Sequence, residues 1–529
     1  MRVILAALAL MLLAAAPAVA APPSSHVWRI TKDHWSAADE AGFGRFVTAL
    51  GDSGCTSSQS CLRSSANPWA ANEDRAFLDI DVDCAKLPYL LRAYYAWKNG
   101  LPFTYADGVS GGRFSKTGNH VVSRQDITDH GGGIDGARAI RALLENVYSG
   151  TFRIDAMSTQ GAPSDFYSPA LQPGSIRPGT VIYDPNGHVG IVYRVDGSGR
   201  IFYMDAHPDF AISRSVYGAQ FGQSQAALGG GLKNWRPFTL VGARMENGAL
   251  IGGHMQMARQ RDIPDFSLVQ YLGTEPNPTG DVRQARFTYN GAALGYYEYA
   301  RVAVSGGKAD FNPLYELQAT MRTLCNDLED RRQAVDQAVQ AGLSARNHPT
   351  TIPANIYLSD DGDWESYATP ARDARLRAAF VQFRRDLGQM IQLWINRDPR
   401  IVYDGQFLKA DLMKVYEAEN RRCTTTFLSS DRQHPVSLTF DDVTRHLFAM
   451  SFDPYNCVEL RWGVEGAACP DQDAKRGWYA REQQARNEIG RDEQGSATRL
   501  AGPADVDIRG LIQSMPERAP FVQRYPGEL

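Results

Sequence analysis

A cysteine and a histidine stand in positions from which each could take part in nucleophilic chemistry. Cys84 follows Asp83 at the start of a predicted helix over residues 84–98. A helix N-terminus carries partial positive charge and free N–H groups, which favour a thiolate and can hold a developing oxyanion. His188 opens a predicted strand directly after a turn rich in Asp, Pro, Asn and Gly. These residue types predict a thiol nucleophile and its general base.

A hairpin after the histidine predicts which residues face it. The sequence Asp-Gly-Ser-Gly over 196–199 is a strong turn signal between two strand-like runs. The simplest register pairs Val195 with Arg200, and its continuation places His188 opposite His207. A bulge of one residue would shift one strand to the other face of the sheet.

An acid lies within reach of the histidine in this register. Asp205 is predicted on the same face as His188 and one diagonal step away, where Gly190 leaves space between them. Asp205 can therefore orient the imidazole and stabilise its charged form, leaving the other ring nitrogen for the thiol. His207 is the alternative third member of the site.

These segments together resemble the NlpC/P60 and CHAP group of cysteine hydrolases. The resemblance rests on Asp-Cys at a helix start and on Pro-Gly-Thr-Val-Ile-Tyr leading to Gly-His-Val-Gly-Ile-Val, and it covers roughly residues 83–208. These enzymes have a papain-like fold and usually cleave peptide or amide bonds in cell-wall peptidoglycan. The resemblance implies Cys84 as nucleophile, His188 as general base and Asp205 as the orienting residue, and it requires neither a cofactor nor a metal.

Two other interpretations nominate the same residues. The chain is also similar to transglutaminase-like peptidases, which place Cys at a helix start, His on a strand and Asp on the next strand. The third interpretation is a non-catalytic binding module, in which a papain-like scaffold keeps a degenerate site.

The first residues predict export. Arg2 precedes an apolar run that ends in Ala18-Val19-Ala20, a pattern typical of a secretory signal peptide cleaved after Ala20. The alternative is an uncleaved membrane anchor. We expect a mature protein without stable membrane insertion, in the periplasm or secreted, where disulfides persist.

The rest of the chain divides by its patterns into an α+β part and a helical part. Residues 21–245 are predicted to form the papain-like domain, with an irregular start over 21–75 and a Gly-rich insertion at 106–136. Residues 246–310 are predicted as a linker with a small β element, and 311–529 as a mainly helical domain of unknown role. The remaining predicted elements are helices at 135–148, 314–340, 370–395 and 474–490, strands at 180–184, 188–195 and 200–205, and aromatic β segments at 287–289 and 296–304.

The balance of charged residues limits the classes of partner that we expect. The 529 residues include 55 basic and 59 acidic side chains, which gives no support for nucleic acid as a partner. Peptidoglycan or a peptide is the expected substrate, and the sequence leaves the oligomeric state open.

The chain has seven cysteines. The most local pairing joins Cys55 to Cys61 and Cys457 to Cys469, and it joins Cys325 to Cys423 across the helical region. The cysteine left over is Cys84.

Overall fold

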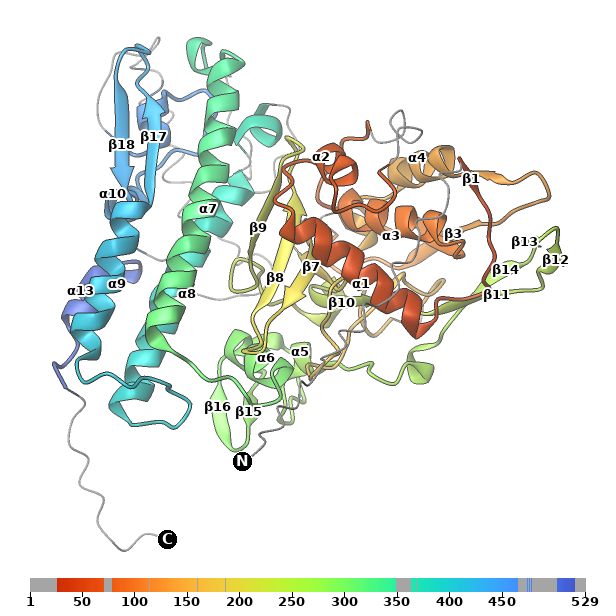
Figure 1. Ribbon diagram of the computed structural model, residues 1–529, viewed down its shortest axis with the longest axis horizontal. Coiled ribbons are helices and arrows are strands. Elements are labelled where there is room, and N and C mark those ends of the chain that lie inside the picture. Colours follow the sequence, from red (N-terminus) through yellow and green to blue (C-terminus); the bar gives the residue numbers. More distant parts are fainter. Residues whose placement is uncertain are drawn as a thin grey trace, which may run out of the picture.

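The computed structural model describes residues 26–518, apart from 71–78, 114, 159, 186, 349–362, 369 and 465–501, of which 473, 475 and 477 are included. The predicted signal segment 1–20 and Cys469 lie outside the described residues, as does nearly all of the predicted helix 474–490. The chain combines helices with antiparallel sheets (Figure 1).

A six-stranded antiparallel sheet lies at the centre of the N-terminal part. Its strand order is β5-β10-β6-β7-β8-β9. The three strands expected from the sequence are confirmed to within one residue. The strands of this sheet are β5 (Phe166–Tyr167), β6 (Val181–Asp184), β7 (His188–Val195), β8 (Ile201–Ala206), β9 (Ile212–Val216) and β10 (Gly231–Trp235).

The β7–β8 register differs from the prediction at the turn and agrees with it further along the strands. Val195 pairs with Ile201, one residue beyond the predicted partner. A bulge within residues 192–194 then absorbs the extra residue, so that Ile191 pairs with Met204 as the predicted register requires. The bulge therefore restores the predicted faces instead of reversing them.

Helices cover both faces of this sheet. One face shares a core with α1 (Ala37–Asp52) and α3 (Lys86–Lys98), and the other packs against Phe221 and α6 (Tyr296–Val304). Alternate strand residues divide between these cores, as the pleat of a strand requires. The first core contains Val181, Tyr183, Val189, Ile191 and Met204, and the second contains Ile182, Val192, Tyr203 and Leu232.

The prediction of an irregular stretch over 21–75 is wrong, because it contains α1 and α2 (Ser58–Arg63). Helix α1 begins after Ser36, whose side chain forms a capping box with Asp39. Its buried residues include Phe43, Phe46, Val47 and Leu50, at offsets of three, four and seven. This signal was present in the sequence, but the polar flanking residues mask it.

The Gly-rich segment 106–136 contributes to a folded hairpin. Strands β2 (Phe103–Val109) and β3 (Val121–Ile127) pair with each other, and β4 (Ile134–Asp135) pairs with β1 (Val27–Trp28). The predicted helix that follows is confirmed as α4 (Gly136–Asn146), with Asp135 as its N-cap.

Residues 246–310 contain more structure than a linker. Tyr296–Val304, expected as a β segment, forms helix α6, because Tyr296, Tyr299, Ala300 and Ala303 recur at helical spacing and pack on the sheet. The short elements around it are β11 (Phe238–Val241), β12 (Arg244–Glu246), β13 (Ala249–Ile251), β14 (His254–Met257), α5 (Val269–Leu272), β15 (Phe287–Tyr289) and β16 (Ala292–Leu294).

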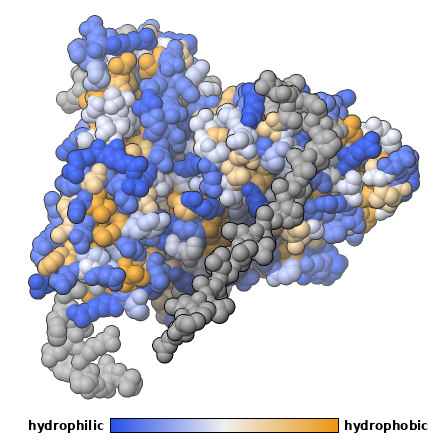
Figure 2. All heavy atoms as spheres, viewed as in Figure 1, coloured by the Kyte–Doolittle hydropathy of each residue, from blue (hydrophilic) through white to orange (hydrophobic). Residues whose placement is uncertain are grey.

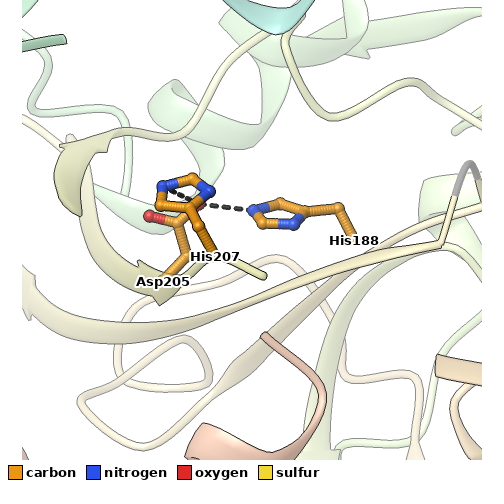
Figure 3. Close-up of side chains that lie close together, drawn as sticks. All are labelled: His188, Asp205 and His207. Carbon is orange, nitrogen blue, oxygen red and sulfur yellow. Dashed lines mark hydrogen bonds and ion pairs between the residues drawn. The ribbon is translucent and has the colours of Figure 1, made fainter. Parts of the chain in front are cut away.

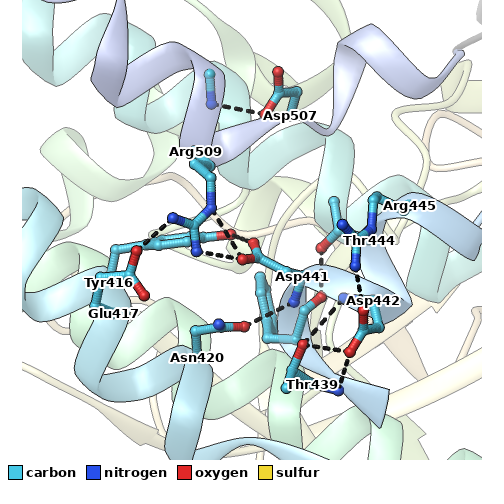
Figure 4. Close-up of polar contacts among 12 residues, drawn as sticks. Tyr416, Glu417, Asn420, Thr439, Asp441, Asp442, Thr444, Arg445, Asp507 and Arg509 are labelled. Atoms are coloured by element: carbon cyan, nitrogen blue, oxygen red, sulfur yellow. Dashed lines mark hydrogen bonds and ion pairs between the residues drawn. The ribbon is translucent and has the colours of Figure 1, made fainter.

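From residue 311 to 518 the described chain is mainly helical, and we call this the helical part. Both long helices predicted here are confirmed. The elements are α7 (Pro313–Gln340), α8 (Pro370–Ile395), α9 (Leu408–Arg422), β17 (Thr424–Leu428), β18 (Pro435–Thr439), α10 (Phe440–His446), α11 (Val458–Arg461) and α13 (Ile508–Gln513). Arg509 on α13 connects three helices of this part, because its guanidinium contacts Glu417 on α9 and Asp441 on α10 (Figure 4).

The cysteine pairing follows the prediction wherever the structure describes both partners. Cys55 is bonded to Cys61 and Cys325 to Cys423, and Cys84 is free. Cys457 is also disulfide-bonded, while its predicted partner lies outside the described residues.

Loss of the Cys325–Cys423 disulfide should destabilise the helical part. The bond joins positions 98 residues apart, and closure of so long a loop restricts the unfolded chain strongly. We expect the double variant Cys325→Ala/Cys423→Ala to lose about 2–4 kcal/mol of unfolding free energy, measured by urea denaturation. The Cys55–Cys61 bond closes a loop of only six residues, so the variant Cys55→Ala/Cys61→Ala should lose less. Equal losses would contradict the loop-length explanation.

Among the described helices, none has both the length and the apolar composition that crossing a bilayer requires. The face in Figure 2 is mostly hydrophilic, with smaller hydrophobic areas over the helical part.

Candidate active site

Four polar side chains form a hydrogen-bonded chain across strands β7, β8 and β9. Nε2 of His188 bonds to Oδ2 of Asp205, and Figure 3 shows the imidazole directed at the acid. Oδ1 of Asp205 accepts a 2.6 Å hydrogen bond from Ser213, whose hydroxyl oxygen lies 2.7 Å from Nε2 of His207. His207 itself is 3.9 Å from the acid. Asp205 is therefore the direct partner of His188, and His207 reaches it mainly through Ser213.

The hydrogen bonds fix which ring nitrogens carry protons. An ionised carboxylate only accepts, so Nε2 of His188 is the protonated nitrogen and Nδ1 has its lone pair available. Among the described residues, Nδ1 of His188 has no hydrogen-bond partner. The imidazole can therefore accept a proton at Nδ1 while Asp205 holds Nε2.

Burial and charge favour this protonation state. Burial, followed by the nearby Arg375, lowers the pKa of His188 below its usual value. Burial alone would raise the pKa of Asp205, but His207 and the hydrogen bond from His188 hold it well below its usual range. At neutral pH the pair is a neutral imidazole and a carboxylate, as a general base and its orienting acid require.

Cys84 lies against the main chain on both sides of His188. Its Sγ is 3.8 Å from the carbonyl oxygen of Gly187, and the N–H of Val189 donates to it. The residue Cys84 is half-buried, and its thiol makes no hydrogen bond to the imidazole in this state. The structure thus joins His188 to Asp205 but leaves the thiol apart from the imidazole. Cys84 packs against the core on the α3 face of the sheet, whereas the His188 ring lies beside Phe221 on the other face.

The expected thiolate at the helix N-terminus is wrong for this state. Oδ1 of Asp83 accepts hydrogen bonds of 3.1 Å from the N–H groups of both Ala85 and Lys86. These N–H groups are therefore not free to stabilise a thiolate or an oxyanion. Burial, followed by the charge of Asp83, raises the pKa of the Cys84 thiol to about 12.

One residue of this site could not be expected from the motifs, and one expectation about Gly190 is wrong. Ser213 pairs with Asp205 across the β8–β9 ladder, but β9 has no distinct strand signal in the sequence. Gly190 does not leave an empty space beside His188, because a side chain there would meet the rings of Tyr203 and Phe221.

Helices α7 and α8 cover this side of the sheet. A cavity of about 40 Å³ is lined by Asp205 and His207 from the sheet and by Asp330, Arg372 and Arg375 from the two helices. Nη2 of Arg372 lies 2.9 Å from Oδ2 of Asp209, and both side chains are less than a tenth exposed. The helical part, whose role the sequence left open, therefore forms one wall of the site.

Asp330 should make the stability of this interface depend on pH. Burial is the main reason that the pKa of the Asp330 carboxyl is raised to about 7. An unfolded aspartate titrates near about 3.9, so above this pH the native chain keeps a proton that the unfolded chain loses. The unfolding free energy therefore falls as the pH rises from about 4 to about 7. We expect Asp330→Asn to reduce this fall, measured as urea unfolding free energy at about pH 5 and pH 8. The same fall in both proteins would contradict the assignment.

The histidines and the acid also have the geometry of a potential metal site. Ligand atoms of His188, Asp205 and His207 lie within 4.8 Å of one another. In addition, Nδ1 of His207 is buried without a hydrogen-bond partner among the described residues. Two imidazoles and a carboxylate are suitable ligands for Zn²⁺.

Comparison with known proteins gives no further information on the function of this site. No protein-family model, curated protein or solved structure matches the chain.

Proposed function

We propose that the protein is a cysteine hydrolase with a papain-like N-terminal domain, which cleaves amide or peptide bonds, most specifically those of cell-wall peptidoglycan. One observation carries the proposal: His188 is bonded to Asp205 on the neighbouring strand, while the thiol of Cys84 lies against the main chain flanking His188. The peptidoglycan substrate is supported by the sequence resemblance around Cys84 and His188.

The protonation states indicate the order of the steps. The resting thiol is protonated and lies apart from the imidazole, so it would first have to come within reach of Nδ1 of His188, which would take its proton as Sγ attacks the substrate carbonyl. The imidazolium, held by Asp205, would then protonate the leaving amine, and water activated by His188 would release the acyl group.

A main-chain group is the candidate for stabilising the oxyanion. Asp83 occupies the N–H groups of Ala85 and Lys86, whereas the N–H of Cys84 has no acceptor among the described residues. This N–H is next to the nucleophile, where negative charge would develop on the carbonyl oxygen.

Purified peptidoglycan provides the test of this function. We expect the full chain to release soluble peptide-containing fragments, detected by mass spectrometry, and Cys84→Ala to release none. The new termini would show whether an amide or a peptide bond is cut. Release that persists in Cys84→Ala would overturn the thiol mechanism.

A metal-dependent hydrolase is the second candidate, because His188, Asp205 and His207 could bind one ion. The two mechanisms respond oppositely to a chelator. The thiol hydrolase should retain its activity in EDTA and lose it with iodoacetamide, whereas the metal enzyme should lose it in EDTA only.

We also propose that the protein acts outside the cytoplasm. The bonds Cys55–Cys61 and Cys325–Cys423 are typical of oxidising compartments and support the expected signal peptide. Sequencing the N-terminus of the protein recovered from the periplasm or the medium should give Ala21 as the first residue. An intact Met1 in that fraction would contradict cleavage after Ala20.

A further inference from the structure

A lysine is buried in the sheet without the partners that a buried charge normally has. Lys233 on β10 is 3% exposed, and within the described residues its ammonium group forms neither a hydrogen bond nor an ion pair. Burying an ammonium group away from water and acceptors is costly, so such groups are usually paired. Its position therefore calls for a ligand or a functional reason.

A second buried cation lies close by and is not neutralised either. Arg236 is 6% exposed and donates to three main-chain carbonyls, those of Ser164, Phe166 and Ala258, at 2.7–3.3 Å. Among the described residues no carboxylate lies within ion-pair distance of Arg236. The carbonyls satisfy its N–H groups, and Asp165, which is paired with Arg124 at 2.6 Å, acts on its charge only from beyond ion-pair distance.

Both cations line one cavity of about 490 Å³, which is within the usual range for small-molecule pockets. Arg259 and Arg261 lie at its exposed rim and share Asp262, at 2.7 and 3.9 Å. Asp155 also lines the cavity, and Lys233 and Arg236 remain the buried charges. None of the candidate active-site residues lines it.

We propose that this cavity binds a small molecule through an oxyanion group, a carboxylate or a phosphate, held between Lys233 and Arg236. The ligand would supply a direct ion-pair partner for the two cations, which Asp155 does not provide within the described residues. The remaining polar lining, which includes Ser158 and Gln160, would contact the rest of the molecule. The site is separate from the thiol site, so it does not depend on the proposed hydrolase activity.

Binding of an anion beside Lys233 should be accompanied by uptake of a proton, which binding to exposed surface charges would not cause. Burial, followed by the nearby Arg236, lowers the pKa of Lys233 to about 7, against the opposing charge of Asp155. A bound anion stabilises the ammonium form, so at about pH 8 binding should draw a proton from the buffer.

Calorimetry on the full chain tests the proposal with acetate, succinate and inorganic phosphate as probes. We expect saturable binding of at least one probe, with an enthalpy that differs between two buffers of different ionisation enthalpy at about pH 8, and a smaller difference at about pH 5.5. A preference for phosphate or for the carboxylates distinguishes the two chemistries.

Lys233→Met and Lys308→Met form a matched pair, because Lys308 is exposed and does not line the cavity. Lys233→Met should weaken binding at least tenfold, and without the anion its melting temperature should equal or exceed that of the wild type. Lys308→Met should bind like the wild type. Absence of binding by all three probes, or equal binding by Lys233→Met, would overturn the proposal. If Lys233→Met does not fold, the buffer dependence of the wild type decides.

Discussion

Cys84→Ala should lower the rate of peptidoglycan hydrolysis by at least about 10³-fold, because removal of the nucleophile from a catalytic unit leaves only binding and oxyanion stabilisation. His188→Ala should cost about as much, since the thiol of Cys84 has a pKa of about 12 and needs a base to lose its proton. The double variant should be no worse than either single one, because residues that act as a unit are not additive. Initial rates of fragment release measure all three.

Two conservative variants separate the roles of Asp205 and His207. Asp205→Asn keeps the shape but removes the charge that holds Nε2 of His188, so we expect a loss approaching that of His188→Ala. His207→Gln changes a residue that is bonded through Ser213, and its loss should be about tenfold or less. If His207→Gln costs as much as Asp205→Asn, and EDTA abolishes activity, the metal site becomes the better explanation.

Arg372→Ala should increase the rate at which iodoacetamide labels Cys84. Arg372 joins α8 to Asp209, and removing one partner of a buried ion pair typically costs about 3–5 kcal/mol. A loss of about 3 kcal/mol from the contact between the helical part and the sheet would raise the population of open molecules about a hundredfold. Because Cys84 is the free cysteine of the described chain, labelling reports on this site.

Arg385→Ala is the matched control, since Arg385 is an exposed arginine of the same helix. It should label at the wild-type rate. Hydrolysis by Arg372→Ala distinguishes two roles for the helical part. Higher activity would show that α7 and α8 restrict access, whereas lower activity at unchanged labelling would show that they contribute to substrate binding. Unchanged labelling and unchanged hydrolysis would mean that this contact does not control the site.

Local patterns were sufficient to predict most elements around the site. The strand that begins at His188, the turn after it and the helix after Cys84 each follow from periodicity and from turn and capping residues close in sequence. The prediction failed where the pattern was read with the wrong period, as in Tyr296–Val304, and where polar residues surround a helix, as in Ala37–Asp52.

Long-range contacts decided the chemical state of the candidate residues. Burial raises the pKa of the Cys84 thiol, which lies against Gly187 and Val189, about a hundred residues further along the chain. Burial depends on what the fold brings together and cannot be derived from the position of a cysteine along a helix. The same holds for Lys233, which the sequence does not distinguish from an ordinary strand lysine.

The sequence alone determined the candidate residues Cys84, His188 and Asp205, and two disulfide pairs that the structure confirms. The candidate residues follow from spacing and strand alternation, which depend on neighbouring residues, and the disulfide pairs follow from taking the most local pairing of an odd number of cysteines. The tertiary structure alone decided that Ser213 links Asp205 to His207, and that α7 and α8 cover the site. These contacts join segments far apart in the chain. The burial that stabilises them depends on the whole fold, so local sequence patterns do not predict them.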